Sequence, residues 1–188
     1  MESWTLINEA VMLAASAHAG QVRKGTKIPY IVHPMEVVAI VAGLTDDPEI
    51  LAAAVLHDVI EDTPYEVGDI EKRFGERVAK LVASDSENKR ENRPAQETWK
   101  IRKKETHEYV RNVATTEEKM IVMGDKLSNL RAIYRDYLKY GDEVWMKFAV
   151  TDKKEHEWYY REFVELLDCF AGTQAYDEYK LLTQKVWG

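Results

Sequence analysis

Cysteine is almost absent from the 188-residue sequence, which contains Cys169 alone. One thiol cannot form a disulfide within the chain, so the sequence does not encode a disulfide-stabilised scaffold and suits a reducing compartment. Cys169 lies in the apolar stretch VELLDCFAG, so we expect a buried, unreactive thiol. The first residues, MESWTLINEA, lack a basic segment followed by a long apolar one, so we expect no signal peptide and a cytoplasmic location.

An excess of positive charge is also lacking. The chain has 26 Lys and Arg against 33 Asp and Glu, a net charge of −7, which disfavours nucleic acid or an anionic membrane as a partner. No run reaches the ~18 apolar residues of a membrane-spanning helix. One segment, residues 85–104, departs from this balance, with seven Lys or Arg between Lys89 and Lys104. We favour a solvated loop and helix face there, and a cationic flap over an anionic substrate stays open.

Alternating β-patterns are nearly absent, and apolar residues instead recur at helical spacing. The prolines of KIPYIVHP favour an ordered loop. The run ILAAAVL is apolar all round and predicts a central helix, which begins after the capping residues Asp46 and Asp47 with Pro48 in its first turn. The length suits one domain with one core, or at most two small lobes. The predicted helices cover residues 5–19, 35–43, 48–60, 65–75, 76–84, 97–113, 116–138, 142–149, 152–171 and 174–186.

The stretch AVLHDVIEDTPYE places an unusual group of polar side chains directly after the buried run. On a continuous helix His57 would lie near Glu61 and Asp58 near Asp62. Buried charges without compensation are costly, and a divalent cation would convert their mutual repulsion into shared coordination.

Two adjacent ligands are too few for a metal site, so others must come from elsewhere in the chain. His33 lies in PYIVHP just before a predicted helix, and Asp125 follows the apolar stretch MIVM. Two imidazoles and two carboxylates suit six-coordinate Mn²⁺ or Fe²⁺ better than a thiolate zinc site. An adjacent His and Asp alone is a weak signal, so spacing by itself leaves a structural role open. The other histidines, at positions 18, 107 and 156, are interpreted as structural or surface residues.

Four motifs in this order, AHAGQVRKGTKIPYIVHP, VLHDVIEDT, FGERVAKLV and GDKLSNLR, resemble the hydrolase domain of RelA/SpoT-type alarmone enzymes. The resemblance covers about residues 10–165, and the short chain is similar to the small alarmone hydrolases, the stand-alone form. It implies an all-α fold, a single-domain HD-type helical bundle over residues 1–188, with a metal site in the central cleft and a C-terminal helix at 174–186. It also implies one Mn²⁺ per chain. The implied reaction is hydrolysis of the 3′-pyrophosphate of guanosine tetra- and pentaphosphate, giving GDP or GTP and pyrophosphate.

The resemblance also implies roles for individual residues. The metal ligands would be His33, His57, Asp58 and Asp125. Glu61 and Asp62 match the acidic pair that acts on the attacking water. Arg23 and Lys24 match the basic pair near the substrate phosphates, and Asn129 matches a substrate contact. Two positions depart from the family pattern: Gly124 replaces an alanine, with a small effect expected, and Ala132 replaces a threonine, which removes a hydroxyl from the nucleoside side.

Three other functions remain open from the sequence. They are another HD phosphohydrolase such as a 5′-nucleotidase, a related phosphatase activity on NADPH, and an inactive module that binds the alarmone. The intact ligands and acidic pair favour an enzyme, and the RKG and EDT motifs favour an alarmone over a simple nucleotide. The expected partner is therefore a small-molecule nucleotide, and the sequence does not decide the oligomeric state.

Overall fold

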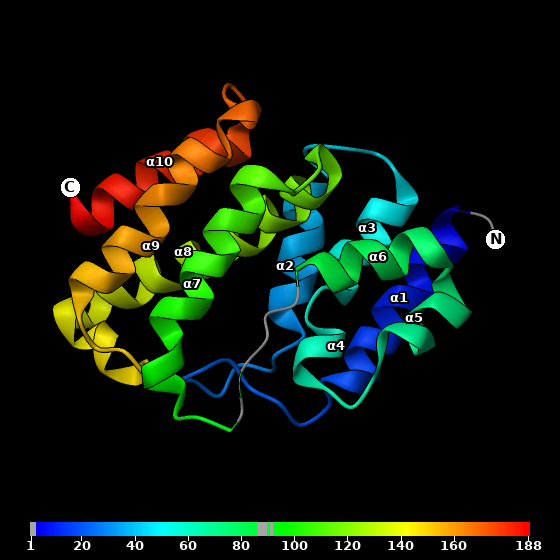
Figure 1. Cartoon of the computed structure of the whole chain (residues 1–188), viewed down its shortest axis with the longest axis horizontal. Coiled ribbons are helices and arrows are strands. Elements are labelled where there is room, and N and C mark those ends of the chain that lie inside the picture. The colour runs from blue at the N-terminus through cyan, green and yellow to red at the C-terminus, as the bar shows by residue number, and fades with distance from the viewer. Residues whose placement is uncertain (1–2, 86–89, 91) are drawn as a thin grey trace. The chain divides into compact units, whose positions relative to one another are not determined.

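The computed structural model describes residues 3–85, 90 and 92–188, and its regular structure is helical (Figure 1). In this described part of the chain there is no strand, and an isolated antiparallel bridge joins Val22 to Pro29. The all-α prediction is confirmed. Within the same residues, no helix is both long and apolar enough to cross a membrane.

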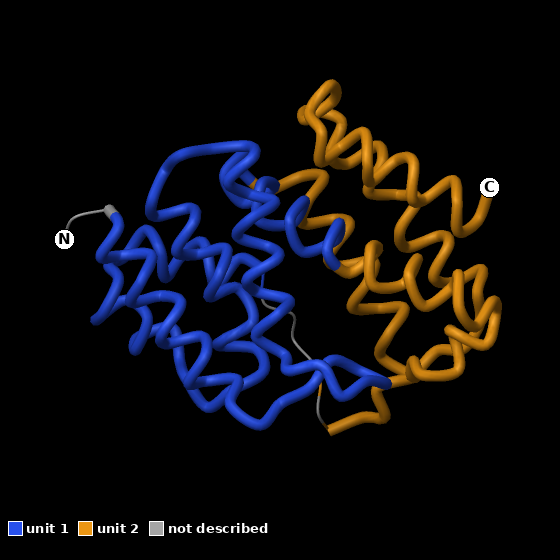
Figure 2. Tube along the Cα trace, turned by 180° about the vertical axis from the view of Figure 1, so that it is seen from behind, with its two compact units in different colours: residues 1–86, 115–128 blue, residues 87–114, 129–188 orange. Residues whose placement is uncertain are grey.

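The chain divides into two compact units, residues 1–86 with 115–128 and residues 87–114 with 129–188 (Figure 2). The first unit contains α1 (Ser3–Ala17), α2 (Val32–Val41), α3 (Pro48–Leu56), α4 (Val59–Asp62), α5 (Val67–Phe74), α6 (Glu76–Ser84) and the first half of α8 (Thr116–Tyr140). The second contains α7 (Ala95–Asn112), the rest of α8, the 3₁₀ helices η1 (Gly141–Lys147) and η2 (Asp168–Phe170), α9 (Lys153–Leu166) and α10 (Gln174–Trp187).

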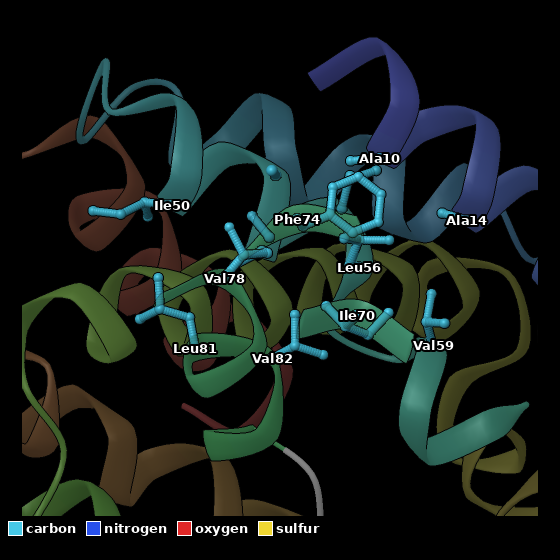
Figure 3. Close-up of a cluster of buried hydrophobic side chains, with 14 of the residues drawn as sticks. Ala10, Ala14, Ile50, Leu56, Val59, Ile70, Phe74, Val78, Leu81 and Val82 are labelled. Atoms are coloured by element: carbon cyan, nitrogen blue, oxygen red, sulfur yellow. The ribbon is translucent and has the colours of Figure 1, made fainter. Parts of the chain in front are cut away.

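Helix α3 is the central element of the first unit, as its apolar run predicts. Asp47 caps it by accepting a hydrogen bond from the Glu49 amide at 2.9 Å, and Pro48 occupies the first turn. The helix packs against α1, α2 and α6, and residues 52–56 are fully buried. Figure 3 shows Leu56 among the side chains with which it forms this core, including Ile70, Phe74, Val78 and Val82.

The prediction of one helix over residues 48–60 is wrong at its C-terminal end. Helix α3 ends at Leu56 and α4 begins at Val59, so His57 and Asp58 lie in the turn between them. The His57 ring nitrogen Nδ1 donates to the Ala54 carbonyl at 2.9 Å, the acceptor that the Asp58 amide would use in a continuous helix. The histidine side chain thereby bonds a carbonyl of the last turn at the point where the helix ends.

Gly124 allows α8 to approach α2 closely in the first unit. A Cβ atom at this position would lie 2.7 Å from Val41 Cγ2, closer than real contacts allow, and 3.1 Å from the Val37 carbonyl oxygen, which is tighter than most real contacts. The replacement of alanine by glycine therefore has a packing role that the sequence pattern did not indicate.

Aromatic side chains form much of the interior of the second unit. The His107 ring stacks on Tyr159 with centroids 5.1 Å apart, and His156 stacks on Trp145 at 4.9 Å. Each of these buried histidines is also hydrogen-bonded to a backbone carbonyl, in line with the structural role expected for both. The expectation of a buried Cys169 is wrong: the thiol is exposed in η2, and its neighbour Phe170 is buried instead.

From Arg90 on, the cationic segment belongs to the second unit, and Lys89 lies outside the described residues. Several of its other charges have partners within that unit. Arg90 bonds Glu105, Arg93 pairs with Glu97 at 3.3 Å, Lys100 pairs with Glu155, and the Lys103 ammonium lies 4.8 Å from the Tyr159 ring centroid. These contacts are what a solvated, salt-bridged helix face would show.

Candidate metal centre

Three segments of the first unit bring the four predicted metal ligands together. His33 is the second residue of α2, slightly later than the predicted position before the helix. His57 and Asp58 lie at the break between α3 and α4, and Asp125 lies on α8. His33, His57 and Asp125 are 3%, 1% and 6% exposed, so their polar atoms depend on one another rather than on water.

The ligand atoms of this cluster lie within a few ångströms of one another. His33, His57 and Asp58 each place one such atom within 4.8 Å of the others. The Nε2 atom of His57 is 3.0 Å from Asp58 Oδ2, and that of His33 is 3.5 Å from the same oxygen. Asp125 Oδ1 is 3.1 Å from His33 Nε2 and 3.8 Å from His57 Nε2. The structure therefore groups all four residues.

The His57 ring shows why this cluster suits a cation. Its Nδ1 must carry the proton in the bond to Ala54, because a carbonyl oxygen only accepts. Its Nε2 atom is buried and has no hydrogen-bond partner, although Asp58 Oδ2 is 3.0 Å away. In the neutral ring, a lone pair thus faces a carboxylate oxygen at short distance. A positive charge between these atoms removes the repulsion.

Burial and neighbouring charge act in opposite directions on the pKa values of the cluster. Burial lowers the pKa of His57, but Asp58 and Asp125 outweigh it and raise that pKa to about 10. Burial raises the pKa of Asp58, but His57 outweighs it and holds the value below its usual range. Burial lowers the pKa of His33, which favours its neutral form near pH 7. The two carboxylates therefore favour a positive charge next to His57.

The donor set fits a divalent cation. Two imidazole nitrogens and two carboxylates are a mixed nitrogen and oxygen set of the kind that binds first-row transition metals. Ligand atoms adjacent to each other around an octahedral ion, with bonds of about 2.1 Å, lie about 3 Å apart. The 3.0, 3.1 and 3.5 Å separations between imidazole nitrogens and carboxylate oxygens are close to that value.

The acidic pair lies directly beyond the cluster. Glu61 and Asp62 are half-buried and form the last two residues of α4, not a continuation of the helix before His57 as the sequence predicted. The Tyr30 hydroxyl donates to Asp58 Oδ2 at 2.6 Å and also lies 3.2 Å from Asp62 Oδ2. This one hydroxyl therefore links a ligand of the cluster to the acidic pair.

The loop that contains Arg23 and Lys24 is tied to the same region. Its Gln21 side chain donates to the Asp62 carbonyl at 2.8 Å, and Gly25 adopts φ +71°, which the turn requires. The Arg23 guanidinium carbon lies 5.5 Å from the Tyr30 ring centroid. Arg23 thus lies next to Tyr30, whose hydroxyl contacts Asp58 of the cluster. Lys24 is exposed on the same turn.

Sequence reasoning missed several residues around the cluster, among them Tyr30, Lys126 and Asp85. The buried Lys126 ammonium bonds Asp125 Oδ2 at 2.6 Å, leaving Oδ1 toward the histidines. Burial raises the pKa of Asp85 to about 7, with Lys126 opposing this. The contact between Lys126 and Asp125 could have been predicted, because this lysine directly follows Asp125 in an apolar stretch. The place of Asp85 near the cluster could not, because Asp85 follows its helix in a polar segment.

Asn129 follows Ser128 on α8 and begins the second of the two segments that form the second unit. Its side chain is half-buried. Its role as a substrate contact stays a prediction, as does the consequence of Ala132 one turn later for the nucleoside.

The chain is similar to known proteins over most of its length. The model of the HD domain family matches residues 10–151. A guanosine-3′,5′-bis(diphosphate) 3′-pyrophosphohydrolase of Xenopus tropicalis is 33% identical over 180 residues, which cover 94% of this chain and 90% of that protein. The bifunctional (p)ppGpp synthase/hydrolase SpoT of Escherichia coli is 49% identical over 76 residues, 40% of this chain. The matched part is only 11% of the length of SpoT.

Two solved structures share the fold. A metazoan orthologue of SpoT that hydrolyses ppGpp superimposes with a TM-score of 0.74 at 26% identity, covering 96% of this chain and 94% of the other. A protein of Listeria monocytogenes EGD-e superimposes with a TM-score of 0.71 at 31% identity, covering 82% and 98%. The chain belongs to the HD domain family and, within it, to the small alarmone hydrolases of the RelA/SpoT (p)ppGpp hydrolase family.

Proposed function

We propose that the chain hydrolyses the 3′-pyrophosphate of guanosine tetra- and pentaphosphate, releasing pyrophosphate and GDP or GTP, in a manganese-dependent reaction. The observation that supports this most is the cluster of His33, His57, Asp58 and Asp125 in a chain that matches a 3′-pyrophosphohydrolase over 94% of its length. One cation per chain would be held by these four residues. When bound, it supplies Lewis-acid chemistry, lowering the pKa of a water molecule and neutralising phosphate charge.

The acidic pair accounts for the proton of the attacking water. In the hydrolysis, a water oxygen bonds to the phosphorus that is attached to the 3′ oxygen. The bond between this phosphorus and the 3′ oxygen breaks. The water loses a proton, and the 3′ oxygen gains one. Glu61 and Asp62 are half-buried acids next to the cluster, so they are placed to accept the water proton or to hold the water in line. We assign this role to the two carboxylates together because close acids titrate as a pair.

The basic pair accounts for substrate binding. A substrate with two diphosphate groups needs positive charge beyond the cation, and a guanidinium can bind phosphate oxygens through two parallel hydrogen bonds. Arg23 is held by its loop against Tyr30, whose hydroxyl contacts Asp58. We therefore propose that Arg23 and Lys24 contact the phosphates, with Asn129 as a further substrate contact.

The substrate assignment is tested by one comparative assay. Purified, Mn²⁺-loaded chain is incubated in parallel with guanosine tetraphosphate, guanosine pentaphosphate, NADPH and nucleoside monophosphates, and the products are identified. We expect pyrophosphate and GDP or GTP from the first two, at the highest kcat/KM. Preferential release of phosphate from NADPH or from monophosphates would assign a different phosphohydrolase activity, and no turnover of any substrate would favour a binding module. A cytoplasmic location stays an expectation from the sequence.

A further inference from the structure

A chain of hydrogen bonds leads away from His33 on the side opposite the cluster. Ser128 Oγ lies 2.8 Å from His33 Nδ1, and the same hydroxyl donates to Glu36 Oε2 at 2.7 Å. Ser128 is 1% exposed and His33 is 3% exposed, so water has little access to their contact. Ser128 comes from α8, whereas His33 and Glu36 lie one turn apart on α2.

Counting protons fixes the direction of these bonds. A serine hydroxyl has one hydrogen, and Ser128 gives it to Glu36. Ser128 can then only accept from His33, so the ring proton of His33 must lie on Nδ1. Its Nε2 atom is left with a lone pair, 3.1 Å from Asp125 Oδ1 and 3.5 Å from Asp58 Oδ2.

Without this chain, the opposite tautomer would be favoured. A neutral imidazole next to a carboxylate gains a hydrogen bond by carrying its proton on the facing nitrogen, and Asp125 is near enough to accept one from Nε2. A protonated Nε2 cannot bind a cation. The contact with Ser128 and Glu36 therefore opposes the tautomer in which His33 could not bind a cation.

We propose that Ser128 and Glu36 are positioning residues that hold the ring proton of His33 on Nδ1 and so keep its Nε2 available for a cation. The inference rests on the proposed metal role of His33. The contrast with His57 supports it. A backbone carbonyl, that of Ala54, fixes the His57 ring, and no side-chain substitution removes that acceptor. The tautomer of His33 depends on two side chains, one from each of two helices.

The first test reads the tautomer directly. Nitrogen-15 NMR of the histidine rings in metal-free full-length chain distinguishes a protonated from an unprotonated Nε2. We expect an unprotonated His33 Nε2 in the wild type. In Ser128→Ala the proton should move to Nε2, and Glu36→Gln should shift the balance less in the same direction, because a neutral acceptor binds the serine hydroxyl more weakly. The His57 signals should be unchanged in both variants.

The second test measures the affinity of the chain for Mn²⁺. Outer contacts of this kind typically change metal affinity by about 10–100-fold, so Ser128→Ala should raise the Mn²⁺ dissociation constant by about that factor. Ser128→Thr, which keeps a hydroxyl, should restore most of the affinity. Ser84→Ala is a control, because the Ser84 hydroxyl donates to the Leu81 carbonyl within its own helix. Turnover by Ser128→Ala should recover at saturating Mn²⁺, since no reacting group has been removed.

Two results would overturn the inference. One is a wild-type His33 that carries its proton on Nε2. The other is a Ser128→Ala variant, folded by its melting curve, with the wild-type tautomer and Mn²⁺ affinity. The proposed activity is judged separately, by guanosine tetraphosphate turnover in the wild type, so the tautomer and the reaction can fail independently.

Discussion

At the scale of single residues, His57 has two effects that the same bond explains. Its Nδ1 donates to the Ala54 carbonyl, which occupies an acceptor of the helix and coincides with the end of α3. The same bond leaves Nε2 facing Asp58 and Asp125. A change that removes the imidazole therefore removes a cation ligand and the side chain that closes the last turn.

The acidic pair gives a prediction at the same scale. Glu61→Gln and Asp62→Asn should keep the bound cation, since neither residue is a predicted ligand, and should lower turnover by about 10²–10⁴-fold. Metal content and kcat are measured on the same preparations. Glu71→Gln, an exposed acid on α5, is the matched control and should behave as wild type. Wild-type turnover in both variants would show that the pair has no part in the reaction.

The sequence indicates ligand types better than it indicates their neighbours. His33, Asp58 and Asp125 could be proposed because histidines are few and these acids follow apolar runs. The contacts of Ser128 with His33 and of Tyr30 with Asp58 join positions 95 and 28 residues apart. Helical periodicity reports neighbours three or four residues apart, so it carries no information about such pairs.

At the scale of elements, the approach of α8 to α2 depends on Gly124. Gly124→Ala should destabilise the chain by about 1–3 kcal/mol, because the added methyl meets Val41 and the Val37 backbone in a packed interior. It should also weaken Mn²⁺ binding, since it displaces Asp125 from His33. The measurements are denaturant unfolding and a metal titration.

Gly68→Ala is the matched control for that variant. Gly68 is also helical, and a Cβ atom there meets nothing within 4 Å. Alanine should stabilise this position by about 0.5–1 kcal/mol through the lower entropy of its unfolded chain. Equal effects of the two substitutions would exclude a packing role for Gly124.

Arg77 joins three elements of the first unit. Its guanidinium bonds Asp47 at 2.8 Å, Glu49 at 2.6 Å and Glu117 at 2.8 Å, linking α6 to the starts of α3 and α8. These groups are partly exposed, so each pair contributes no more than about 1 kcal/mol. Arg77→Met should therefore lower the free energy of unfolding by about 1–2 kcal/mol at pH 7.

The pH dependence of this effect has a definite sign. The Arg77 hydrogen bond lowers the pKa of Asp47 below its usual 3.8, so the folded state binds this proton less readily than the unfolded chain. The stabilisation is present above pH 3.8 and is lost as the pH falls through the lower folded value. The difference between wild type and Arg77→Met should shrink in acid. A difference that grows below pH 4 would contradict this assignment.

Most helices could be predicted because a single apolar stripe, repeated over several turns, determines them. The two irregular points had no such signal. The break at His57 coincides with the bond from its side chain to the Ala54 carbonyl, and the exposed Cys169 lies in a 3₁₀ turn in which Phe170 is buried instead. Both depend on one local bond or turn, which the surrounding apolar pattern masks.

At the scale of the whole molecule, the residues of the proposed chemistry concentrate in the first unit. The four ligand residues, the acidic pair and the basic pair all lie within residues 1–86 and 115–128. The second unit contains the described part of the cationic segment, in which several charges have acidic partners. The chain is acidic overall, so binding of an anionic substrate must depend on local cations.

Substitutions of Arg23 and Arg93 distinguish the contribution of the basic pair from that of the cationic segment. Arg23→Ala should reduce kcat/KM by about 10–100-fold, the loss of a charge-assisted hydrogen bond to phosphate. Arg93→Ala should have a smaller effect that fades with salt, because Arg93 is exposed and pairs with Glu97. Both variants are assayed at low and moderate salt. A larger loss from Arg93→Ala at both salts would mean that the cationic segment contacts the substrate.

A cation held by His33, His57, Asp58 and Asp125 is the central requirement of the proposed hydrolysis. The most direct measurement is the metal content per chain, by elemental analysis after Mn²⁺ loading and desalting, for wild type and His57→Ala. We predict one Mn²⁺ per wild-type chain and none in the variant, with hydrolysis of guanosine tetraphosphate lost together with the metal. Full Mn²⁺ occupancy in folded His57→Ala would contradict the assignment of this cluster as the metal centre.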